Sequence, residues 1–314
     1  MIKTDVIIVG GGPAGAACAW KLQQHQVDFL LLDKATFPRF KPCAGWITPQ
    51  VLLDLEINAS GYPHSIIHFD SFQVFIKGFS FKLHTDQYAI RRVEFDDWLL
   101  QRSNTHYVNH TVKSIIIENN RYVIDQEFSA NHIIGAGGTH CPVNQTFFNN
   151  LGEKRGSLIV AQEEEFAYDF ADDRCYLWFL QNGLPGYAWY VPKSNGFVNV
   201  GVGGSAAELK AKKDTLKRHW TLLVEKLNEM GLVRSHDFRP VGHSYYLRGK
   251  NSIVRRGNAF IIGDAAGLAT RDMGEGIGPA IQSGIRAARA IISGSDYSVA
   301  LIKKYSFPSI LGFR

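Results

Sequence analysis

The chain has 314 residues, of which 45% are hydrophobic and 20% charged, and its formal net charge is +5. This is a globular composition, and the length allows two packed units or one elaborated domain. The 34 basic residues are spread among 29 acidic ones instead of forming a basic arm, so we expect no nucleic-acid partner.

The cysteines and the apolar N-terminus exclude further classes. Cys18, Cys43, Cys141 and Cys175 are far apart and form no C-x-x-C pair, which argues against a zinc site and against a disulfide framework. The apolar stretch 6–20 contains four glycines and a proline, which argues against a signal peptide and a membrane span. We therefore expect no metal and a cytoplasmic protein.

The N-terminal sequence predicts a strand–helix–strand unit. An apolar strand over 6–9 is followed by glycines, by a helical stretch over about 13–25 and by a second strand over 29–32. Asp33 closes the second strand, where its carboxylate can accept hydrogen bonds from an adenosine ribose.

The glycines of this unit have the spacing of a dinucleotide-binding turn. Gly10 permits the tight turn, Gly12 lets the backbone approach a pyrophosphate, and Gly15 lets helix and strand pack closely. The pyrophosphate would then lie at the helix N-terminus. The motif alone does not separate FAD from NAD.

Two later segments favour FAD. In GNAFIIGDAAG, a strand over 259–262 ends at Gly263 and presents Asp264, which can accept a hydroxyl of a ribityl chain. In MGEGIGPAIQ, glycines precede a helix whose positive N-terminus favours the negative charge of a reduced flavin. We therefore expect Gly276 and Ile277 beside the flavin ring.

A third segment, RRVEFDDWLLQR, predicts a helix with Phe95 and Leu99 facing inward. Arg92 at the helix entrance is placed to bind a phosphate or the ribityl hydroxyls.

The ordered set G-x-G-x-x-G, KPCAG, R-x-x-F-D-x-x-L, GAGG, GDAAG and GEGI resembles the flavoprotein superfamily of para-hydroxybenzoate hydroxylase. Within it, KPCAGW (41–46) and PGYAWYVP (185–192) resemble the Lys-x-Cys-Gly-Gly loop and the Pro-x-Tyr-x-Trp-x-Phe-Pro segment of the geranylgeranyl reductase family. The resemblance covers essentially the whole chain. It implies noncovalent FAD and reduction of carbon–carbon double bonds in a prenyl-type apolar substrate.

By this resemblance, the FAD-contacting positions are Gly10, Gly12, Ala14, Gly15, Asp33, Ala44, Gly45, Arg92, Val112, Asp264, Gly276 and Ile277. Val112 is carried over from the expected strand HTVKSIII, toward the adenine. No second dinucleotide fold is visible, so NAD(P)H, ferredoxin or another donor must visit transiently. Cys43 and Tyr187 are the candidates near the reacting carbons, with Cys43 as a proton donor or a steric element facing the flavin.

The sequence also departs from the family pattern. Ala44 replaces a glycine of the cysteine loop, Gly137 stands where relatives have an acid, and Val191 replaces an aromatic residue. The chain also ends sooner after Asp264 than many relatives, which leaves the size of the substrate open.

The predicted fold class is α/β, α+β overall. It is a Rossmann-like FAD-binding domain with a central parallel sheet and a second domain built on one mixed antiparallel sheet. The expected FAD-binding domain comprises 1–64, 89–150 and 251–314, and the expected substrate domain comprises 65–88 and 151–250.

Two features of the second domain bear on function. A single amphipathic helix is expected over 208–230, with a basic outer face that is solvated or contacts an anionic membrane. In YAWYVP, alternation places Tyr187, Trp189 and Val191 on one face of a strand. We expect Tyr187 and Trp189 to form the wall of the substrate site rather than ordinary core.

Three alternatives remain open. An aromatic hydroxylase that activates oxygen needs the same FAD frame, and a flavin halogenase has a similar aromatic segment, for which Lys77 is the candidate lysine. A protein that binds FAD without turnover is the third. The oligomeric state is not determined by the sequence.

Overall fold

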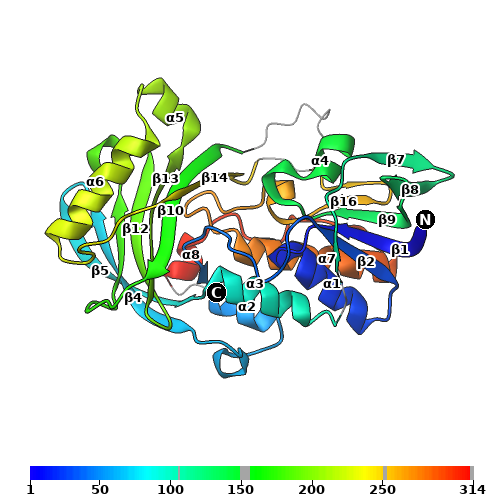
Figure 1. Cartoon of the computed structure of the whole chain (residues 1–314), viewed down its shortest axis with the longest axis horizontal. Helices are drawn as coiled ribbons and strands as arrows, with labels where there is room; N and C mark the ends of the chain where they lie inside the picture. Colours follow the sequence, from blue (N-terminus) through cyan, green and yellow to red (C-terminus); the bar gives the residue numbers. More distant parts are fainter. Residues whose placement is uncertain (105–106, 149–155, 250–252, 312–314) are drawn as a thin grey trace. The chain divides into compact units, whose positions relative to one another are not determined.

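The computed structural model describes residues 1–104, 107–148, 156–249 and 253–311. It divides the chain into two compact units (Figure 1). The first unit comprises Met1–Arg39, Val93–Gly156 and Tyr246–Tyr305, and the second comprises Phe40–Arg92, Ser157–Tyr245 and Ser306–Arg314.

The expected domain boundaries differ from these units in three places. Residues 306–311 group with the second unit, although they are expected in the FAD-binding domain, and residues 246–249 group with the first unit, although they are expected in the substrate domain. Residues 40–64 and 89–92 group with the second unit, because β3 (Trp46–Ile47) pairs antiparallel with β5 (Phe79–Ala89) of the second sheet. The expected boundaries at 150/151 and 250/251 lie outside the described residues. The functional assignment of each unit stays a prediction.

The first unit contains the expected sheet with a parallel centre. Its strand order is β15-β16-β9-β1-β2-β6, and β7 and β8 extend it from β9. β1 pairs parallel with β2 and β9, and β9 pairs parallel with β16. The strands are β1 Ile2–Val9, β2 Phe29–Asp33, β6 Val108–Asn109, β7 Ile115–Glu118, β8 Arg121–Ile124, β9 Phe128–Gly135, β15 Arg255–Arg256 and β16 Ala259–Ile261.

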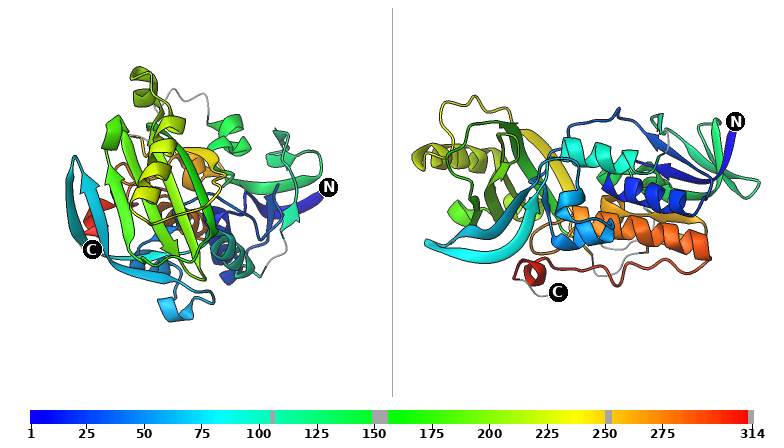
Figure 2. Two further views of the ribbon diagram at one scale, coloured as in Figure 1. Left: turned by 60° about the vertical axis from the view of Figure 1, so that its left-hand side comes forward. Right: turned by 90° about the horizontal axis from the view of Figure 1, so that it is seen from below.

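The helices of this unit follow the sequence signals. They are α1 Pro13–Gln24, α3 Arg92–Gln101, α4 Pro142–Phe147 and α7 Ile277–Ser293, with short 3₁₀ turns η2 Gly138–His140 and η5 Gly263–Ala266. The side chains of Phe95 and Leu99 are fully buried, as predicted. α1 and α7 lie side by side (Figure 2), and a Cβ atom on Gly284 would stand 2.2 Å from the carbonyl oxygen of Ala14. This contact requires a small residue in α7.

The second unit contains one mixed sheet assembled from separated parts of the chain, as predicted. Its strand order is β14-β10-β13-β12-β11-β4-β5-β3, with β11 and β4 parallel. The remaining strands are β4 Ile67–Ile76, β10 Leu158–Ala167, β11 Cys175–Phe179, β12 Gly186–Lys193, β13 Phe197–Ser205 and β14 Val241–Tyr246. The helical segments are α2 Pro49–Asp54, η1 Ala59–Gly61, η4 Gln181–Gly183, α5 Ala206–Ala211, α6 Leu216–Glu229 and α8 Phe307–Ile310.

β12 is an inner strand of this sheet, between β13 and β11. Ala188 and Tyr190 belong to a hydrophobic core with Trp220 and Leu223 of α6, which covers that face of the sheet (Figure 2). The alternate residues of β12 therefore point to the opposite face. We call it the aromatic face; its β12 members are Tyr187, Trp189, Val191 and Lys193.

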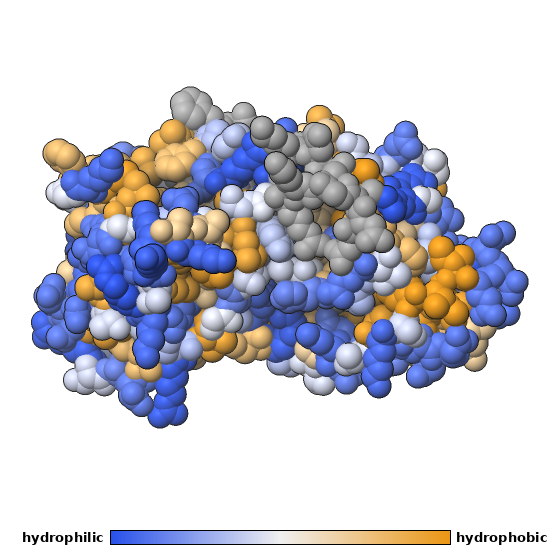
Figure 3. All heavy atoms as spheres, turned by 90° about the horizontal axis from the view of Figure 1, so that it is seen from above, coloured by the Kyte–Doolittle hydropathy of each residue, from blue (hydrophilic) through white to orange (hydrophobic). Residues whose placement is uncertain are grey.

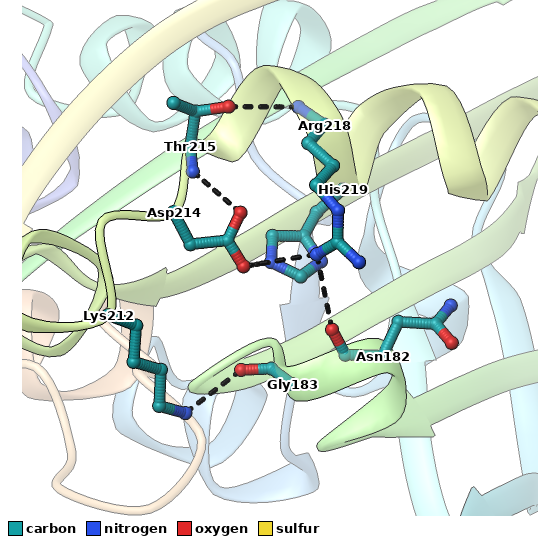
Figure 4. Close-up of polar contacts among 7 residues, drawn as sticks. All are labelled: Asn182, Gly183, Lys212, Asp214, Thr215, Arg218 and His219. Carbon is teal, nitrogen blue, oxygen red and sulfur yellow. Dashed lines mark hydrogen bonds and ion pairs between the residues drawn. The ribbon is translucent and has the colours of Figure 1, made fainter.

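The prediction of one helix over 208–230 is wrong. The chain forms α5 and α6 with a break between them, where Lys213 has a φ of 53°. Thr215 caps α6 by accepting a hydrogen bond from the amide of Arg218, and Asp214 accepts one from the His219 ring at 2.8 Å (Figure 4). Such caps favour a helix start over continuation of the preceding helix.

Candidate functional site

The glycine turn before α1 requires residues without side chains. Gly10 has a φ of 113°, and a Cβ atom there would stand 2.4 Å from the carbonyl oxygen of Ala136. A Cβ on Gly15 would stand 1.8 Å from the carbonyl oxygen of Gly10. Gly12 is the N-cap of α1 and makes no side-chain capping bond. Its end of the helix can therefore present amide groups to an anion.

Asp33 fixes this turn from the end of β2. Its Oδ2 accepts a hydrogen bond from the amide of Gly11 at 2.6 Å, and its Oδ1 accepts one from the amide of Ala35 at 2.8 Å. A carboxylate has about four acceptor positions, so capacity for a ribose hydroxyl remains.

Asp264 lies in η5, next to the start of α7. Its Oδ1 is 3.4 Å from the position that a Cβ on Gly276 would take. Gly276 is the N-cap of α7 and also lacks a side-chain capping bond, and Ile277 begins the helix. A Cβ on Gly263 would stand 2.9 Å from the Cβ of Ala14, so η5 also packs against α1. The first unit thus brings the glycine turn, Asp264 and the α7 N-terminus together.

Arg39 is a candidate ligand that the sequence analysis missed. Its Nη2 is 3.3 Å from the position of a Cβ on Gly12, its guanidinium lies over the ring of Phe37, and it pairs with the fully buried Asp96 at 3.2 Å. A cation held beside a glycine turn suits a phosphate. The clue in the sequence was an arginine in the loop that follows Asp33.

These features fit FAD. Two helix N-termini without side-chain caps, a glycine cradle and two carboxylates supply donors for a pyrophosphate and acceptors for ribose and ribityl hydroxyls.

Val112 is not in a strand. It is half-buried in the segment between β6 and β7, because β7 begins only at Ile115. Ala44, Gly45 and Arg92 belong to the second unit, so their approach to the same cofactor stays a prediction.

The Cys43 loop is held by Lys193. The amide of Gly45 donates to Cys43 Sγ at 3.3 Å, and the amide of Ile90 donates to the carbonyl of Gly45 at 3.0 Å. Lys193 Nζ donates to the carbonyl of Ile90 at 2.6 Å and lies 3.8 Å from Glu165 Oε2. A Cβ on Gly45 would be only 2.3 Å from the carbonyl oxygen of Ile90, and Gly45 has a φ of 71°, so glycine is required there. Lys193 is fully buried, and burial lowers its pKa.

The aromatic face carries a row of rings. Tyr187 stacks on Trp46, with ring centroids 6.4 Å apart, and contacts Phe179 and Trp189 at 5.2 and 5.6 Å. Tyr187 is half-buried, but Trp189 is only 5% exposed. The Trp189 indole lies over Gly201, where a Cβ would be 2.2 Å from its Cζ2, and its N–H donates to Asn199 Oδ1 at 2.7 Å. Trp189 is thus held firmly in the sheet.

The lysine suggested for halogenation is not on this face. Lys77 is exposed in the turn between β4 and β5, with a φ of 48°. The lysine of the aromatic face is Lys193, which strand alternation from Tyr187 and Trp189 would have found.

Two absences concern the described residues alone. Within residues 1–104, 107–148, 156–249 and 253–311, no helix is long and apolar enough to cross a membrane. The same part of the chain contains no group of three or more His, Cys, Asp or Glu side chains arranged to hold a metal ion.

Comparison with known proteins places this geometry in a family. Residues 8–41 match the NAD(P)-binding Rossmann-like domain family. An uncharacterized protein of Methanosarcina barkeri is 31% identical, over 100% of this chain and 82% of its own length. Digeranylgeranylglycerophospholipid reductase 2 of Methanosphaera stadtmanae is 25% identical, over 97% of this chain and 82% of its own length.

A solved structure has the same fold. The geranylgeranyl bacteriochlorophyll reductase-like protein of Thermoplasma acidophilum aligns with a TM-score of 0.80 at 23% identity, over 95% of this chain and 81% of that one. Together with the glycine turn, the Asp264 turn and the Cys43 loop, these matches show that the chain belongs to the geranylgeranyl reductase family of FAD-dependent oxidoreductases.

Proposed function

We propose that the protein reduces carbon–carbon double bonds of a prenyl-type apolar substrate. The observation that carries this proposal is the row formed by Trp46, Tyr187 and Trp189 on the aromatic face. Apolar rings with few polar atoms suit a hydrocarbon chain. The reductase name of the Methanosphaera stadtmanae relative supports the same substrate class.

Residues of the first unit would hold FAD noncovalently. The N-terminus of α1, with Gly10, Gly12, Ala14 and Gly15, binds the pyrophosphate, and Asp33 accepts from the adenosine ribose. When bound, FAD supplies hydride-transfer chemistry.

The other end of the cofactor has its own residues. Asp264 accepts from the ribityl chain, and the α7 N-terminus at Gly276 and Ile277 favours negative charge on the ring. Ala44, Gly45, Arg92 and Val112 complete the proposed contacts. The electrons come from an external donor, NAD(P)H or ferredoxin.

Residues of the second unit would position the substrate. Tyr187 and Trp189 bind the apolar chain and exclude water, and Trp189 keeps its orientation through Asn199. Cys43 presents its thiol from a loop that Lys193 fixes through Ile90. That thiol is a candidate proton donor near the reacting carbons.

Tyr187→Phe tests this proposal. We expect normal FAD content and a lower turnover of a geranylgeranyl lipid, because the ring stays and only the positioning hydroxyl is lost. Tyr176→Phe is the matched control, since Tyr176 belongs to the core on the α6 side of the sheet. Equal turnover of both variants with a prenyl lipid, at wild-type level, would contradict the assignment of the aromatic face.

We also infer peripheral contact with a lipid surface through the β4–β5 hairpin. Phe79 is 76% exposed and Phe81 45% exposed, beside the exposed Lys77 and Lys82. Apolar side chains flanked by lysines suit an anionic interface. The face shown in Figure 3 has separate hydrophobic areas among hydrophilic ones.

Phe79→Ser should reduce co-sedimentation of the protein with phosphatidylglycerol vesicles. Unchanged binding would exclude the hairpin as the site of lipid contact.

A further inference from the structure

A buried acid and a histidine whose side chain is 18% exposed meet on the aromatic face, and nothing in the proposed function uses them. Glu163 of β10 is fully buried, and its Oε1 lies 3.4 Å from Nδ1 of His243 on β14. Among the residues that the structure describes, no hydrogen-bond partner is found for either carboxyl oxygen of Glu163. The same holds for Nδ1 of His243. An isolated charge would be costly there.

The pair lies directly beside the aromatic rings. A Cβ on Gly201 would stand 2.2 Å from Trp189 Cζ2 and 2.7 Å from Glu163 Cβ, so the indole and the acid pack against the same glycine. Asn199 accepts the indole N–H and lies next to Glu163. Trp189 and Glu163 therefore share one wall of the second unit.

Burial and the nearby charges determine the protonation state of the pair. Burial raises the pKa of Glu163 to about 7, opposed by Lys193, Asn199 and Lys41, with Glu165 adding to the rise. Burial lowers the pKa of His243 to about 3, with Lys41 and Arg92 acting in the same direction. Below about pH 7 the pair therefore carries one ionisable proton, and it loses this proton as the pH rises above 7.

We propose that Glu163 and His243 store the proton that completes reduction of the double bond. Lys193 extends from the neighbourhood of this pair to the Cys43 loop, since its charge interacts with Glu163, Glu165 and Cys43. It is the link between the store and the thiol. This inference rests on the proposed function and adds the source of its proton.

The reaction balances with this assignment. Two electrons and one hydrogen reach one substrate carbon as hydride, a new C–H bond forms at the other carbon with the stored proton, and the pair is left one proton short. Nearby Lys193 and Lys41 stabilise the carboxylate that remains. Solvent restores the proton, and the external nicotinamide or iron–sulfur donor restores the two electrons.

The first test measures the proton directly, by infrared spectroscopy of the purified protein with and without FAD. A carboxylic-acid carbonyl band should be present below pH 7 and disappear above it, and Glu163→Gln should remove it. Glu164→Gln is the matched control: Glu164 is the next residue of β10, points to the opposite face and pairs with His236 at 2.9 Å. Absence of a titrating band in the wild-type protein would overturn the proposal.

The second test measures turnover of a prenyl lipid. Glu163→Gln should lower kcat by about 10²-fold or more with little change in KM, and should remove the pH dependence near 7, whereas Glu164→Gln should behave as wild type. Wild-type kcat in Glu163→Gln would overturn the proposal. If Glu163→Gln does not fold, two infrared measurements test the proposal instead. The wild-type protein should show the titrating carboxylic-acid band, and His243→Gln should shift the pH at which this band titrates.

The two tests separate the claims. A titrating band without turnover of any alkene would contradict the proposed function but would support a proton held by Glu163 and His243. Alkene turnover without the band would overturn the proton store alone.

Discussion

Trp189→Phe should destabilise the second unit more than the same change at Trp178. Both indoles are nearly fully buried, at 5% and 1% exposure, and both substitutions delete the same atoms. They differ in one hydrogen bond: Trp189 donates to Asn199 Oδ1 at 2.7 Å, whereas the Trp178 N–H has no partner among the described residues.

The difference can be estimated from this bond. Asn199 is 1% exposed, so removing its donor leaves a buried acceptor unsatisfied, which costs about 1–3 kcal/mol. Trp178→Phe removes an N–H that has no such bond and costs only the lost volume. We therefore expect Trp189→Phe to lower the free energy of unfolding by about 1–3 kcal/mol more than Trp178→Phe.

Urea unfolding of both tryptophan variants, each with and without Asn199→Leu, measures the contribution of this hydrogen bond to the free energy of unfolding. The Asn199 substitution should cost less in the Trp189→Phe background than in the wild type, because the orphaned acceptor is removed with it. Prenyl turnover should fall in Trp189→Phe and not in Trp178→Phe, which lies on the α6 side of the sheet. Equal costs for the two tryptophans, with no coupling to Asn199, would refute the reasoning.

Three further predictions concern other parts of the molecule. Gly15→Ala should abolish FAD retention, because its Cβ would stand 1.8 Å from a backbone oxygen that cannot move away; absorbance of the purified protein checks this. Glu163→Gln should remove a pH dependence of stability. The pKa of this acid is raised from about 4.5 to about 7, so the free energy of unfolding of the wild type falls by up to about 3 kcal/mol as the pH rises through this window. Unfolding curves at several pH values should show this loss in the wild type and not in the variant. Thr215→Ala should cost about 1 kcal/mol through the lost cap of α6, and an unchanged urea midpoint would contradict the assigned helix start.

Local sequence signals predicted the first unit well. The glycine spacing, the strand over 29–32 and the break at Gly263 each depend on neighbouring residues, and β1, α1, β2 and η5 follow them. The helix over 208–230 was wrong because its apolar spacing continues across the break, and the caps at Asp214 and Thr215 were overlooked.

The second unit was harder to derive in detail because its contacts are distant in the chain. Glu163, Asn199 and His243 come from three strands, and no local pattern brings them together. The position of Lys193 on the aromatic face could be predicted from the sequence, since it alternates with Tyr187 and Trp189. Its contact with the Cys43 loop could not. The pairing of β3 with β5, which moves 40–64 to the second unit, is likewise a long-range contact.

Re-oxidation of the anaerobically reduced, FAD-loaded protein tests the central claim most directly. The yellow protein is first reduced and then mixed with a geranylgeranyl lipid, with its fully saturated analogue, or with oxygenated buffer, and the recovery of flavin absorbance is followed with product analysis. We predict fast recovery and a product with two more hydrogens for the unsaturated lipid, and slow recovery for the other two. Fast recovery with oxygen, together with no reduced product from the geranylgeranyl lipid, would contradict the assignment as a prenyl reductase.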